Sequence, residues 1–112
     1  MAAVAVNNFK TITHNVSTGT PTEIYTSPTG YTSVFLLLQV TNIESTTKTI
    51  SVNHVRGSTS TELLKEYPIV ANDSLDLLPG KLVLQTGDKL AISGNANGVL
   101  KLVASVLETS NF

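Results

Sequence analysis

Residues 32–43 read TSVFLLLQVTNI, and this stretch decides the fold class. It is strongly apolar, and it contains neither glycine nor proline. Successive side chains of a strand point to opposite faces, and here both faces are apolar. One face carries Val34, Leu36, Leu38 and Val40, and the other carries Phe35, Leu37 and Ile43. Since an antiparallel strand usually keeps one polar face, we expect a central strand that is covered on both sides.

Residues 99–108 show the same pattern near the end of the chain. One face carries Leu100, Leu102, Ala104 and Val106, and the other carries Val99, Val103 and Leu107. Two explanations are open: a loop of the chain covers the second face, or another subunit does. The low charge of the chain favours the subunit, because interface cores are depleted in charged residues. The candidate subunit-interface residues are Phe35, Leu37, Val103 and Leu107.

Turn signals rich in glycine, proline, asparagine and serine divide the rest of the chain into short segments. Such spacing is typical of an all-β sandwich or barrel. We predict an antiparallel β-sandwich of about eight strands, either jelly-roll or immunoglobulin-like. The expected strands are 9–16, 22–27, 32–43, 47–56, 60–66, 74–78, 81–86, 88–94 and 99–108. The expected core residues are Leu36, Leu38, Val40, Ile50, Val52, Leu82, Leu84, Leu100, Leu102 and Val106.

One segment has an alternative interpretation as a helix. Thr59 to Glu62 matches a helix capping box, and Leu63, Leu64 and Tyr67 follow at helical spacing. The segment is barely two turns long before Pro68, so we favour a strand there.

The length of 112 residues predicts one domain. We expect a sandwich over residues 9–112 and an N-terminal arm over residues 1–8, whose small apolar side chains would order only against a neighbour. The net charge of -1 argues against nucleic acid as a partner. No segment is long enough to span a membrane, and the first residues make a poor signal peptide. The absence of cysteine excludes a disulfide, a thiolate metal site and a cysteine nucleophile.

The residues that could support catalysis or metal binding are scattered. His14 and His54 stand apart without metal-ligand spacing, and we expect structural roles for both. His54 and Arg56 could form an ion pair with Glu62 or Glu66. Asp73 and Asp88 occupy turns, where aspartate caps backbone groups. We therefore predict no catalytic residue, no metal and no cofactor.

Seven stretches together resemble small virion structural proteins of tailed bacteriophages, particularly those that infect marine bacteria and cyanobacteria. They are NNFKT at 7–11, IYTSPTGYTSV at 24–34, LQVTNI at 38–43, HVRG at 54–57, IVANDS at 69–74, GKLVLQTGD at 80–88 and SVLET at 105–109. The resemblance runs nearly end to end and implies a non-enzymatic β-sandwich in the virion, assembled in the host cytoplasm. It implies a capsid decoration (cement) protein or a neck or tail accessory, and of these we favour a decoration protein that binds the major capsid protein.

Other functions remain open. A neck, tail or baseplate accessory is the next most favoured function after the decoration protein. A fibre protein with a receptor- or carbohydrate-binding module is a further alternative, although aromatic residues, which usually stack on sugar rings, are only 5% of the chain. A small enzyme is the least favoured. We expect the chain to associate with itself. The resemblance implies a homotrimer, whereas the residues alone suit a dimer equally well.

Overall fold

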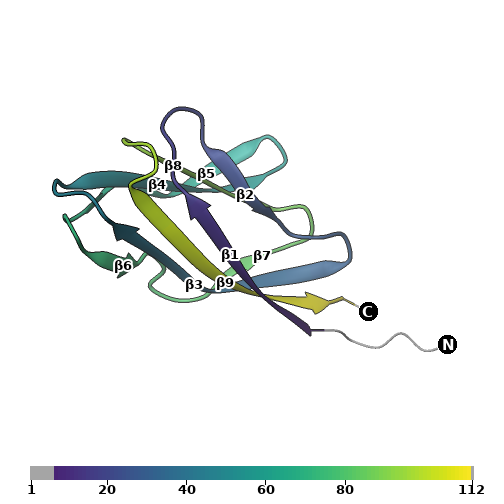
Figure 1. Cartoon of the computed structure of the whole chain (residues 1–112). Coiled ribbons are helices and arrows are strands. Elements are labelled where there is room, and N and C mark those ends of the chain that lie inside the picture. The colour runs from purple at the N-terminus through teal and green to yellow at the C-terminus, as the bar shows by residue number, and fades with distance from the viewer. Residues whose placement is uncertain (1–6, 112) are drawn as a thin grey trace.

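Residues 7–111 are described by a computed structural model, and they form nine β-strands without a helix (Figure 1). The strands are β1 (Asn7–Asn15), β2 (Thr22–Thr26), β3 (Tyr31–Asn42), β4 (Lys48–Arg56), β5 (Thr59–Ile69), β6 (Ser74–Asp76), β7 (Leu82–Leu84), β8 (Lys89–Gly94) and β9 (Leu100–Ser110). They make two antiparallel sheets. Sheet A has the order β1-β9-β3-β6, with β7 also paired to β3, and sheet B has the order β2-β8-β4-β5. The predicted all-β antiparallel sandwich is confirmed.

The strand pairing is that of a jelly roll. β1 pairs with β9, β2 with β8, β3 with β6 and β7, and β4 with β5. The chain is thus one long hairpin, folded over so that its strands fall into two sheets, which is how jelly rolls are built. β6 and β7 lie one after the other along β3, as a single strand with a break. Pro79 lies in the break, where its missing N–H cannot donate to the ladder. This pairing decides between the two sandwich types that the sequence left open.

The core lies between the inner faces of the two sheets. Eight of the ten predicted core residues are buried: Leu38, Val40, Ile50, Val52, Leu84, Leu100, Leu102 and Val106. Leu82 packs against this core and is partly buried. Leu36 is the exception, since 39% of its surface is exposed, and its assignment to the core was wrong.

A β-bulge in β3 explains this error. Phe35 lies opposite Val106 and Leu37 lies opposite Ser105, so Leu36 is an extra residue in β3. A bulge of this kind shifts the alternation of side chains by one position. As a result Phe35 faces the core together with Leu38, and the predicted grouping of Val34 and Leu36 with Leu38 does not hold across the bulge.

The strand that was favoured over a helix for residues 60–66 is confirmed as part of β5, which pairs with β4 along its length. The expected N-terminal arm is corrected at its boundary. Of the expected arm over residues 1–8, Asn7 and Asn8 belong to β1, because they pair with Thr109 and Glu108 of the last strand. Residues 1–6 lie outside the described residues.

Candidate functional site

The four candidate interface residues do not all lie on one surface. Phe35 is fully buried and contacts the ring of Tyr25 edge-on, with the ring centroids 5.3 Å apart. It is a core residue, and its prediction as an interface residue was wrong because of the bulge beside it. Leu37 and Leu107 are half-buried and Val103 is exposed. All three lie on the outer face of sheet A, on the neighbouring strands β3 and β9.

The strand register shows what surrounds these three residues. Leu107 of β9 pairs with Phe9 of β1 on one side and with Val34 of β3 on the other. Val34 in turn pairs with Val83 of β7. These four residues form an apolar row that crosses the whole outer face of sheet A. The side chain of Phe9 is 74% exposed and that of Val83 is 52% exposed. With the neighbouring Leu36, Leu37 and Val103, the row makes a surface that we call the apolar face.

The sequence pointed to only part of the apolar face. Leu37, Val103 and Leu107 were expected there, whereas Leu36 was expected in the core and Val34 was placed on the same strand face as Leu36. Phe9 and Val83 were not singled out, although the alternation around Val83 already placed it on the other strand face from Leu82 and Leu84. Only the register between strands brings Phe9 beside Leu107.

A buried carboxylate holds the turn before β8. Asp88 accepts two hydrogen bonds from Arg56, at 2.8 and 2.7 Å, and lies 3.1 Å from Nε2 of His54. It also accepts a bond from the backbone N–H of Gln85, which confirms its predicted role as a turn cap. The hydrogen bonds from the Arg56 guanidinium hold the pKa of Asp88 well below its usual range. Arg56 and His54 thus pair with Asp88 and not with Glu62 or Glu66, the partners considered from the sequence. The contacts with Asp88 brace β4 against the turn.

A second buried carboxylate links the two sheets. Glu108 of β9 accepts hydrogen bonds from the hydroxyl of Tyr25 and from Lys10, whose Nζ lies 3.1 Å from Oε1. Tyr25 belongs to sheet B, and its hydroxyl also lies 2.7 Å from Oγ of Ser33 in sheet A. Burial and the neighbouring Glu108 raise the pKa of Tyr25. Burial acts to raise the pKa of Glu108, but the hydrogen bonds from Tyr25 and Lys10 lower it overall. Because these groups satisfy one another, the cluster is suited to joining the sheets.

The two histidines lie apart, as expected. His14 is on β1 of sheet A and His54 is on β4 of sheet B. Nε2 of His14 is buried without a hydrogen-bond partner, and burial lowers the pKa of this imidazole. Over residues 7–111, no group of three or more histidine, aspartate or glutamate side chains could hold a metal ion. No helix in the same range is able to span a membrane.

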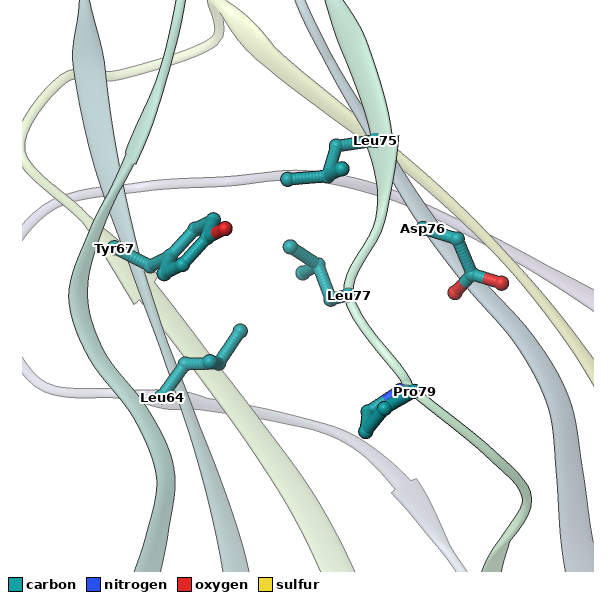
Figure 2. A pocket seen from close by; sticks show the side chains of 6 residues that line it. All are labelled: Leu64, Tyr67, Leu75, Asp76, Leu77 and Pro79. Atoms are coloured by element: carbon teal, nitrogen blue, oxygen red, sulfur yellow. The ribbon is translucent and has the colours of Figure 1, made fainter.

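A groove runs along one edge of the sandwich, between β5 and the segment that joins β6 to β7. Figure 2 shows Leu64, Tyr67 and Leu77 turned toward one another there, with Asp76 turned away. The space at this point is about 260 Å³ and adjoins a further space of about 330 Å³, which Leu63, Leu78 and Leu82 help to line. Oδ1 of Asp76 already accepts hydrogen bonds from the N–H groups of Leu38 and Leu78. The groove is therefore suited to an apolar side chain and offers little to a polar ligand.

The geometry thus offers two surfaces for apolar contact, the apolar face of sheet A and the groove beside β5. The apolar face crosses four paired strands, whereas the groove follows one edge of the sandwich. In comparisons with known proteins, no family model matches the chain, and no curated protein matches it in sequence.

Proposed function

We propose that the chain is a non-enzymatic structural subunit of a tailed-bacteriophage virion, and specifically a capsid decoration protein that stabilises the head through protein–protein contacts. The observation that carries this proposal is the apolar face of sheet A. The resemblance of the seven sequence stretches to phage structural proteins supplies the choice of particle. The jelly-roll fold is compatible with this choice but does not decide it, because lectins and cupins share the fold.

The apolar face has the chemistry of a binding surface. Exposed apolar patches that cross several strands mark interaction sites in soluble proteins, and each 100 Å² of apolar surface removed from water contributes about 2.5 kcal/mol before the costs of association. Phe9, the most exposed residue of the face, is also the kind of aromatic anchor that is enriched at interfaces. No charged side chain belongs to the apolar face as defined above, so a capsid protein can cover it without burying an unpaired charge.

A decoration protein stabilises a particle by mass action. It binds the assembled lattice and not the dissociated subunits, and its binding free energy therefore adds to the stability of the assembly. The proposed partners are the major capsid protein and further copies of the chain itself, in the virion after assembly in the host cytoplasm.

A matched pair of leucine variants tests this proposal. Leu36 lies on the apolar face and is 39% exposed, and Leu63 lies on β5 in sheet B and is 38% exposed. Leu36→Lys should abolish binding to heads of the cognate phage that lack this protein, while Leu63→Lys should bind like the parent. Both variants should keep the circular dichroism spectrum of the β-sandwich. Equal binding of the parent and of both variants would overturn the role of the apolar face.

The copy number of the protein in purified virions tests the location. Hundreds of copies per particle, measured by quantitative mass spectrometry, would support decoration of the head. A dozen or fewer would favour the neck, tail or fibre instead. Absence from the virion would overturn the proposal in every form.

A further inference from the structure

The edges of the two sheets are protected unequally. A sheet edge presents unpaired N–H and C=O groups that can pair with another strand, and proteins interrupt the edges that must stay unpaired. In sheet B, β2 is short and has a bulge between Glu23 and Tyr25, and β5 contains Pro68 and two bulges. In sheet A, β6 and β7 have only three residues each. These edges carry the devices that prevent pairing.

The β1 edge carries none of them. Its residues Asn7 to Asn15 pair with β9 without a shift of register, and the strand contains neither proline nor glycine. Lys10 is its only lysine or arginine, and this side chain is engaged by Glu108 of the same protein. Within residues 7–111, β1 is therefore the one long, regular and uninterrupted edge.

We propose that β1 pairs with β1 of a second copy of the chain, in antiparallel orientation about a two-fold axis. The side chains on the outer face of β1 suit such self-pairing: Asn7, Phe9, Thr11, Thr13 and Asn15 are all exposed and uncharged. An axis at Thr11 sets Phe9 of one copy opposite Thr13 of the other and Asn7 opposite Asn15. No like charges meet across this contact, whereas like charges that face each other across strands are destabilising.

This dimer would enlarge the proposed binding surface. A two-fold axis that relates antiparallel neighbours within one sheet is perpendicular to the sheet, so both copies turn the same face to the same side. The apolar row ends at Phe9 on β1, and pairing of β1 therefore brings the two apolar faces together as one surface. Use of that joint surface on a capsid rests on the proposed function, while the pairing of β1 does not. A β1 pair is two-fold, so the proposed assembly is a dimer, in contrast to the homotrimer that the family resemblance implies.

Lysine substitutions on two edge strands test the pairing. Thr11→Lys with Thr13→Lys places like charges across the proposed contact. The control, Thr59→Lys with Thr61→Lys, makes the same change at exposed positions of the β5 edge. In sedimentation and light scattering over a concentration series, the parent and the control should be dimers. The β1 variant should have half their mass, or a dissociation constant raised at least tenfold, with an unchanged β spectrum.

Single cysteines give a second measurement that does not depend on the stability of those variants. The natural chain has no cysteine, so Thr11→Cys introduces one thiol near the proposed axis, where two Cα atoms lie within disulfide distance. We expect rapid formation of a covalent dimer under mild oxidation, and none for the control Thr61→Cys. A monomeric parent, a trimeric parent, a dimer that survives the β1 lysines, or equal crosslinking of the two cysteine variants would each overturn the inference.

The two proposals fail in different measurements. A parent that is monomeric but still binds heads would contradict the β1 contact alone. A dimer that crosslinks through Thr11→Cys but does not bind heads would support the β1 contact and contradict the proposed function.

Discussion

The outer faces of the two sheets differ in chemistry, although their inner faces are alike. In sheet A the row across four strands is Phe9, Leu107, Val34 and Val83. A row of the same width in sheet B is Glu23, Ala91, Asn53 and Glu62. A sandwich requires only its inner faces to be apolar. The outer face of sheet B thus shows what the fold itself needs. The apolar row of sheet A goes beyond that need, and the proposed contact with another protein would account for it.

The largest losses in the free energy of unfolding should be similar for the two sheets, because they come from substitutions in the core that both sheets share. Leu102 of sheet A and Ile92 of sheet B are both buried. We expect Leu102→Ala and Ile92→Ala each to lower the free energy of unfolding by about 2–5 kcal/mol, measured by urea denaturation. Val103→Ala, next to Leu102 but on the outer face, should cost less than about 1 kcal/mol. A large cost for Val103→Ala would mean that the chain itself covers the outer face.

Intermediate effects should come from the buried carboxylates, of which Asp88 braces sheet B and Glu108 joins both sheets. Asp88→Asn and Glu108→Gln should each cost about 1–3 kcal/mol at pH 7, because each replaces a buried charged acceptor with an amide that satisfies the same donors poorly. Both pKa values are lowered in the folded protein. The stabilisation is therefore complete above the unfolded-state pKa, about 4, and is lost as the pH falls through the folded pKa.

Thermal unfolding between pH 7 and pH 2 measures this dependence. The parent should lose stability below about pH 4, and each variant should lose less. The exposed Glu62→Gln serves as a control, with an expected change below about 0.5 kcal/mol. If Asp88→Asn and the parent had parallel pH profiles, Asp88 would not be the charged acceptor described above.

Substitutions on the two outer faces should change stability least, but they should differ clearly in how they change dye binding. Val83→Thr in sheet A and Glu62→Thr in sheet B should each change the free energy of unfolding by less than about 0.5 kcal/mol, since both side chains are exposed. Only Val83→Thr should reduce the fluorescence of a dye that binds apolar surfaces. Equal dye binding by the two variants and the parent would show that the apolar row is not accessible in solution.

Local chemistry in the sequence determined the fold class and most of the strands. Alternation in residues 47–56 and 99–108 predicted the inner faces of β4 and β9, because the period of a strand depends only on its own backbone. The turns were equally local. Gly87 and Asn72 adopt positive φ angles of 84° and 57°, which these residue types tolerate better than others. The prediction of Asp88 as a turn cap was also local, because an aspartate in a turn accepts hydrogen bonds from nearby backbone N–H groups.

The tertiary structure decided which face of each strand meets which neighbour. The bulge at Leu36 moves Phe35 into the core and Leu36 out of it, and the sequence carries no mark of a bulge there because the whole run is apolar. The pairing of Arg56 and His54 with Asp88 spans more than thirty positions of sequence. Pattern reasoning paired these residues with nearer acids instead.

The same division applies to the candidate site. The sequence by itself determined that two strands would be apolar on both faces, since this is a property of each strand taken alone. It did not determine that Phe9 and Val83 extend that surface, or that β1 is the regular edge. Those features depend on the register between strands that are distant along the chain, and register is set by how all nine strands pack together around one core.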